Sequence, residues 1–113
     1  MELSIETLAD DVTKINLVGK LDILGAQEID LQFSVLCGGK KKVIVDLNQV
    51  SFLASMGIRT IVIGAKTINS KGGRMALLQP TPDVEKVLTS SGVDTVVSIV
   101  HDLDAAIGAV SIR

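Results

Sequence analysis

Hydrophobic residues between positions 43 and 73 follow first the pattern of a strand and then that of a helix. Residues 43–47 are almost wholly apolar, as is typical of a strand that is buried on both faces of a sheet. From Met56 onward, apolar residues recur at the spacing of one helix face, and this helix is predicted to end near Gly72 and Gly73. Residues 48–54 are predicted to be the connection, which places Ser55 at the N-cap of the helix.

The N-terminal part of the chain predicts a β-hairpin followed by a helix. Apolar residues alternate with polar ones on both sides of Asp10 and Asp11, which predicts two strands joined by a turn. Residues 24–37 then carry apolar side chains at helical spacing, and Gly38 and Gly39 predict the end of that helix.

The C-terminal part predicts two further strands, at residues 75–78 and 96–100, and two short helices. Thr81 is a predicted N-cap with Pro82 at the first helical position, and Gly92 stops this helix. Asp102 is the predicted cap of a last helix, which runs to about Val110.

This order of elements predicts an α/β fold. Strands that alternate with helices after an N-terminal hairpin belong to a sheet whose later strands are parallel and joined by crossover helices. We therefore expect a mixed sheet of four to five strands with about four helices, most of them on one side of the sheet. No repeat, low-complexity tract or linker divides the chain, so residues 1–113 are predicted to form a single domain.

Composition and charge exclude several classes of protein. A chain of 113 residues that is 47% hydrophobic can bury its own core, and Cys37, the single cysteine, excludes an internal disulfide. The acidic Glu2 and the short apolar runs predict a cytoplasmic protein that is not inserted in a membrane. A net charge of -2, without tryptophan or tyrosine, argues against nucleic acid as a partner, and the lysines at 40–42 are interpreted as a solvated turn.

The sequence lacks the motifs that usually mark an enzyme or a metal site. Its two Gly-Lys pairs are followed by leucine and lysine, which excludes a P-loop. His101, the single histidine, is followed by Asp102, but the nucleophile elbow of a serine hydrolase is absent around Ser55. We therefore expect no catalytic activity, no bound metal and no cofactor.

The residues around Ser55 leave alternatives open. Serine is among the best N-cap residues, so Ser55 can have a purely structural role. Met56 suits either the core or a protein contact, and it shares a helix face with Arg59, three residues on. Asp22, at the end of the second predicted strand, suits a turn or a cap for the first helix.

Two segments resemble the signature of STAS domains, the family of anti-sigma factor antagonists and of the cytoplasmic tails of sulfate transporters. DLNQVSFLASMG, residues 46–57, resembles the family's apolar strand, its short loop with an aromatic residue, and its Asp-Ser-Ser-Gly segment that opens a helix. GKLDILGAQEI, residues 19–29, resembles the family's Gly-Glu-Leu-Asp segment before its first helix. The resemblance covers essentially the whole chain and implies a mixed sheet of four to five strands with helices.

The resemblance also implies a function in partner switching. Ser55 corresponds to the serine that is phosphorylated in anti-sigma factor antagonists, whose unphosphorylated form binds a serine-kinase anti-sigma factor. A PP2C-type phosphatase resets the switch. The partner-binding surface implied by the resemblance comprises Asp22, Asn48, Ser51, Ala54, Ser55, Met56, Gly57 and Arg59.

Two positions depart from the family pattern. Ala54 stands where the family has an acidic residue, and Met56 stands where it has a second serine. Because Ala54 lacks the carboxylate of the family's acidic residue, phosphorylation of Ser55 is expected to be less efficient. Two other functions stay open: a constitutive interaction module of a signalling scaffold or membrane transport complex, and a binder of nucleotides or other small ligands. The expected assembly is a monomer or a weak dimer.

Overall fold

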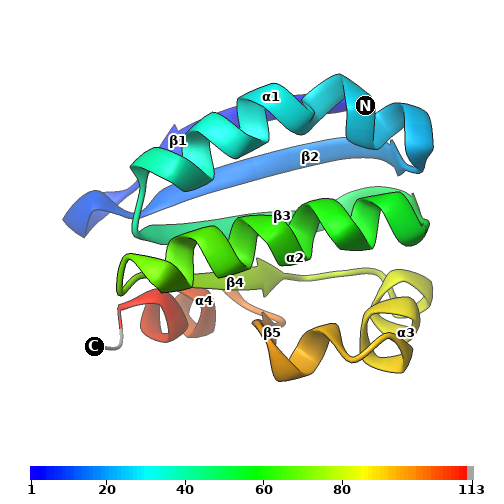
Figure 1. The fold of residues 1–113 in the computed structure, drawn as a ribbon. Helices are drawn as coiled ribbons and strands as arrows, with labels where there is room; N and C mark the ends of the chain where they lie inside the picture. Colours follow the sequence, from blue (N-terminus) through cyan, green and yellow to red (C-terminus); the bar gives the residue numbers. More distant parts are fainter. Residues whose placement is uncertain (112–113) are drawn as a thin grey trace.

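The computed structural model describes residues 1–111, which form a five-stranded sheet with helices on both faces (Figure 1). The strands are adjacent in chain order, from β1 at one edge to β5 at the other. Two short 3-10 helices, η1 and η2, precede β2 and β5. The elements are β1 (Glu2–Thr7), η1 (Ala9–Asp11), β2 (Thr13–Leu21), α1 (Ile23–Gly39), β3 (Lys42–Leu53), α2 (Ser55–Ser70), β4 (Arg74–Leu78), α3 (Pro82–Ser90), η2 (Val93–Thr95), β5 (Ser98–Val100) and α4 (Leu103–Val110).

The sheet is mixed, as the sequence predicts. β1 is antiparallel to β2, and β2 to β5 are parallel to one another. Asp10 and Asp11, with φ angles of 60° and 61°, form the turn of the predicted hairpin. Each parallel step requires a crossover, which α1, α2 and α3 provide. Within residues 1–111, no helix combines the length and the apolar character that are needed to cross a membrane.

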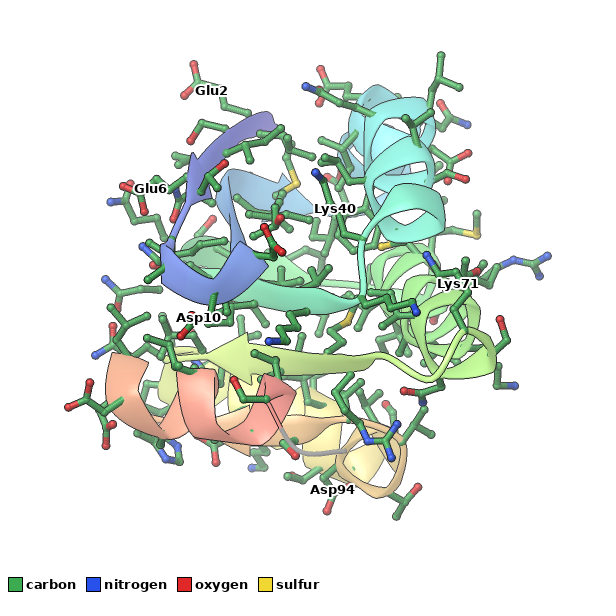
Figure 2. All side chains as sticks on the ribbon, turned by 90° about the vertical axis from the view of Figure 1, so that its left-hand side faces the viewer. Glu2, Glu6, Asp10, Lys40, Lys71 and Asp94 are labelled. Atoms are coloured by element: carbon green, nitrogen blue, oxygen red, sulfur yellow. The ribbon has the colours of Figure 1, made fainter. Side chains whose placement is uncertain are left out.

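α1 and α2 lie side by side on one face of the sheet, with their N-termini at the same end (Figure 1). Phe33 of α1 and Ile61 of α2 pack against the sheet in the larger apolar cluster, which Val84 of α3 joins. α4 covers the opposite face, where Ala106 packs with Ile44 in a second cluster (Figure 2). Three helices therefore share one cluster, which agrees with the expectation that most helices lie on one side.

β3 is longer than the sequence predicts. Residues 48–53, expected to form a connection, continue the strand and pair with β2 as far as Leu53, which lies opposite Leu21. In this stretch β3 twice carries one more residue than β2, so the register shifts at two bulges. The buried residues Leu47, Val50 and Leu53 consequently recur at every third position. A search for the two-residue alternation of a strand does not find this pattern.

The C-terminal caps follow the prediction, whereas the last strand is shorter than expected. The side chains of Thr81 and Asp102 each accept a backbone N–H three residues further on, at 3.4 and 2.7 Å. β5 comprises only Ser98–Val100, because the turn before it occupies the preceding backbone. The N–H of Val97 donates to the carbonyl of Val93 at 3.0 Å and is therefore unavailable to the sheet.

Two contacts hold α1 and α2 together at close range. Gly64 of α2 faces α1, and a Cβ at this position would lie 2.6 Å from the Phe33 ring and 2.9 Å from Sγ of Cys37. Lys71, the residue after α2, reaches the end of α1 (Figure 2). Its Nζ donates to the carbonyl oxygens of Cys37 at 2.6 Å and Lys40 at 2.9 Å. The ammonium group thus caps the C-terminus of α1, where a cation also suits the helix dipole.

We predict that Lys71→Met lowers the free energy of unfolding by about 1–2 kcal/mol, because two carbonyl groups lose a charged donor. Urea-induced unfolding followed by circular dichroism measures the change. Lys66→Met is the matched control, since Lys66 is exposed on α2 and its substitution is expected to change stability by less than about 0.5 kcal/mol. Equal stability of the two variants would contradict the capping role.

Candidate functional site

The predicted site lies where the adjacent strands β2 and β3 end and the helices α1 and α2 begin. Leu21 and Leu53 are paired at the carboxyl ends of the two strands. The next residues are Asp22 and Ala54, and the Ala54 N–H donates to the Leu21 carbonyl at 3.0 Å. This bond extends the sheet contact into the start of α2. The structure therefore brings Asp22 and Ser55 to the same edge of the sheet, as the sequence predicts.

Asp22 is the N-cap of α1. Its Oδ1 accepts the backbone N–H of Gly25 at 2.8 Å, which confirms the cap that the local sequence left open as one alternative. The side chain is half-buried and has a second carboxylate oxygen outside this bond. Asp22 therefore holds the start of α1 while carrying negative charge at the edge where Ser55 lies.

Ser55 is the first residue of α2 and not its N-cap, which corrects the prediction. Ala54 is the N-cap, and its methyl group accepts no hydrogen bond. The first intrahelical bond runs from the Ile58 N–H to the Ala54 carbonyl at 3.0 Å. The N–H groups of Ser55, Met56 and Gly57 therefore lack an acceptor within the helix. The Ser55 side chain is exposed beside these donors.

Met56 and Arg59 are exposed on the same side of α2, as the sequence predicts. Met56 is 40% exposed, so it belongs to the surface and not to the core. Both side chains line a groove of about 370 Å³ between α1 and α2. The other lining residues are Ala26, Gln27, Asp30, Phe33, Ser34, Cys37, Thr60, Ile63, Gly64 and Thr67.

Gly57 is buried, so it contributes no exposed side to a partner-binding surface. A Cβ at this position would lie 2.5 Å from the carbonyl oxygen of Leu21 and 2.9 Å from Cδ1 of Leu53. Only a glycine lets the first turn of α2 rest this closely on the end of the sheet. The role of Gly57 in the fold is therefore to position Ser55.

Asn48 and Ser51 are exposed on β3, not on the predicted loop. Ser51 Oγ donates to the Gly19 carbonyl at 3.5 Å, and the Asn48 N–H donates to Asp46 at 2.9 Å. Asn48 precedes Ser55 by a stretch of extended chain that spans roughly 20 Å at the usual rise of a strand. The structure therefore places Asn48 at a distance from Ser55 along β3, not next to it.

Two exposed apolar residues at this edge were missed by the sequence analysis. Phe52, at the end of β3, is 50% exposed, and Ile23, the first residue of α1, is 57% exposed. Together with Met56 they add exposed apolar area where β2 and β3 end. The sequence indicates that Ile23 is exposed, because Ile23 falls outside the apolar positions that repeat along the buried face of α1.

The polar groups that could support catalysis are not assembled at Ser55. His101 Nε2 contacts Glu85 of α3 at 2.8 Å. Burial raises the pKa of the Cys37 thiol to about 11, which the positive charge of Lys71 offsets in part, so the thiol stays protonated at neutral pH. Among residues 1–111, no cluster of three or more histidine, cysteine or acidic side chains could hold a metal ion.

The sequence profile of the STAS domain matches residues 6–106 of this chain. The chain belongs to the STAS domain family. This STAS domain is 28% identical over 94 residues to an anti-sigma F factor antagonist of Lysinibacillus sphaericus, a match that covers 81% of this chain and 80% of that protein.

Solved STAS structures share the fold described above. The crystal structure of a candidate anti-sigma factor antagonist from Thermotoga maritima has a TM-score of 0.88 and 28% identity, and the match covers 97% of this chain and 95% of that one. The phosphorylated form of the Bacillus cell fate determinant SpoIIAA has a TM-score of 0.72 and 24% identity, covering 95% and 97% of the two chains. The likeness to SpoIIAA concerns the fold alone.

We predict that Gly57→Ala lowers the free energy of unfolding by about 1–3 kcal/mol, because the added methyl group meets backbone and forces α2 away from the sheet. Thermal and urea unfolding measure the loss. Gly38→Ala in the last turn of α1 is the matched control, since a Cβ there meets nothing within 4 Å. The control should keep or slightly raise the stability. A harmless Gly57→Ala would contradict the close packing.

We predict that Ala54→Asp raises the free energy of unfolding by about 1 kcal/mol, because a carboxylate at the N-cap accepts one of the free N–H groups of α2 and suits the helix dipole. Ala54 has the extended conformation of an N-cap, with φ -113° and ψ 175°. Ala54→Asn separates the hydrogen bond from the charge and should give most of the gain at neutral pH. If neither variant is more stable than the wild type, the start of α2 does not need a cap.

Proposed function

We propose that this STAS domain is an anti-sigma factor antagonist whose affinity for an anti-sigma factor is controlled by phosphorylation of Ser55. The observation that carries the proposal is the position of Ser55: an exposed hydroxyl at the first residue of α2, next to backbone donors without a helical acceptor. The similarity to the anti-sigma F factor antagonist of Lysinibacillus sphaericus supports the same assignment.

The start of α2 suits a phosphate group. Free N–H groups and the positive end of the helix dipole favour an anion at a helix N-terminus. Because the side chain of Ala54 occupies none of these donors, a phosphate on Ser55 would not have to displace a cap. The SpoIIAA fold likewise occurs in a phosphorylated form. Phosphorylation of Ser55 is therefore expected to leave the domain folded.

The surface around Ser55 suits a protein partner in the unphosphorylated state. Ile23, Phe52 and Met56 supply exposed apolar area, and Asp22 and Arg59 supply one charge of each sign. A phosphoserine adds about -1.5 to -2 charges at pH 7. Trapping such a charge in an interface without a matching cation is costly, so the modified form is expected to release its partner.

The enzymes that operate the switch would be supplied by other chains. A serine kinase that is also the anti-sigma factor would phosphorylate Ser55, and a PP2C-type phosphatase would remove the phosphate. The domain itself would act by binding: the His101 imidazole is engaged with Glu85, and the Asp22 carboxylate caps α1. The domain would work in the cytoplasm, where these partners act.

The test compares Ser55→Ala with Ser55→Asp in affinity capture from the source organism, followed by mass spectrometry of the partner and of Ser55. Since Ser55 is not the N-cap, we predict that the melting temperature changes little in either variant. Wild type and Ser55→Ala are expected to capture a kinase-type ATPase. Ser55→Asp, which imitates the charge of the phosphorylated state, is expected to capture less than a tenth as much.

Ser98→Asp is the matched control, because Ser98 is exposed on β5 at the far edge of the sheet. It should capture the partner as the wild type does. Equal capture by both Ser55 variants, with Ser55 unmodified in the cell, would instead favour a constitutive interaction module. Membrane transport subunits as the captured partners would point to the same alternative.

A further inference from the structure

The outer face of α1 carries apolar side chains that the fold leaves uncovered. Leu24, Leu31 and Val35 are 69, 79 and 66% exposed. At 100° per residue they fall within about 40° of one another on the helix, directly opposite the buried Phe33. α1 is thus apolar on two opposite faces, although a surface helix normally turns a charged face to solvent. We call these three residues and Glu28, which lies among them, the α1 stripe.

The spacing within the α1 stripe is that of a helix seam. Leu24, Glu28, Leu31 and Val35 follow one another at intervals of four, three and four residues, which are the d and a positions of a heptad. Leucine occupies both d positions and Val35 one a position, so three of the four seam positions carry large apolar side chains. The stripe therefore fits a second helix laid along α1.

The charges on this face favour a second copy of the same chain. Apart from Glu28, the residues flanking the stripe on the outer half of α1 are uncharged, and they include Gln27, Gln32 and Ser34. Two copies facing each other would therefore meet little like-charge repulsion. A strongly charged partner would meet almost no opposite charges on this face of α1. The edge strand β1 is less suited to self-pairing, because Glu2 and Glu6 point to one face of it.

We propose that two copies of this chain associate weakly through the α1 stripe, with their α1 helices antiparallel about a two-fold axis. In this arrangement Leu24 of one copy packs against Val35 of the partner subunit, and Leu31 of each copy lies opposite Glu28 of the partner subunit, next to the axis. A symmetric dimer uses the same patch twice, which the self-complementary spacing of the stripe allows. The proposal does not depend on the function of Ser55.

The size of the stripe sets the strength of the dimer. Three large side chains and their polar flanks bury roughly 500 Å² on each copy, or about 1,000 Å² in all, which is at the lower end for a specific interface. Glu28 weakens it further, because its carboxylate, which contacts the Met1 amino group of its own chain, would be placed against the apolar Leu31 of the partner subunit. Association is therefore expected in the range of about 10 µM to 1 mM.

Sedimentation velocity of the purified full chain between about 10 µM and 1 mM tests the proposal. The wild type should shift from monomer towards dimer as its concentration rises. Leu31→Glu should stay monomeric throughout, because each new carboxylate would face Glu28 of the partner subunit. The matched control is Leu103→Glu: Leu103 is 40% exposed on α4, on the other face of the sheet, and its substitution should leave the dimer unchanged.

Glu28→Leu completes the heptad and should tighten the dimer by about tenfold or more, since it removes the carboxylate and adds apolar area. Its carboxylate also contacts the Met1 amino group at 2.6 Å, so circular dichroism is used to verify that every variant is folded. A wild type that remains monomeric at the highest concentration overturns the proposal. So does a dimer that Leu31→Glu leaves intact or that Glu28→Leu does not strengthen.

Discussion

The parallel pairing of β2 with β3 is the constraint on which the rest of the structure depends. The pairing runs to Leu21 and Leu53, so both strands end at the same level and both following helices start there. The Ala54 N–H then bonds to the Leu21 carbonyl, and Gly57 permits α2 to rest on that same carbonyl. Any shift between the two strands would move Ser55 away from Asp22. The site is therefore a product of strand register.

The start of α2 combines a well-fixed backbone with an unfilled set of donors. Most helices satisfy their first N–H groups with a capping side chain, as Asp22 does for α1 and Asp102 for α4. α2 has Ala54 as its N-cap and leaves these groups to solvent or to an anion. A missing cap costs about 1 kcal/mol of stability, which is consistent with a position kept for a reversible modification.

α1 connects the two surfaces that this protein presents. Its first residues lie at the Ser55 edge, its inner face fills the core through Phe33, and its outer face carries the α1 stripe. Lys71 and Gly64 bind it tightly to α2. Because the α1 stripe points away from the sheet, a dimer formed there would leave the first turn of α2 accessible to another protein.

The sequence by itself determined the order of elements, the mixed sheet, the N-caps at Thr81 and Asp102, and the shared helix face of Met56 and Arg59, because these follow from local periodicity and capping chemistry. Tertiary structure alone decided the course of residues 48–53, where bulges against β2 convert an apparent loop into strand. It also decided that Gly57 is buried, that Ala54 and not Ser55 is the N-cap, and that Asn48 lies far from the site. Each of these features depends on how one strand packs beside another. A short stretch of sequence carries no information on that packing.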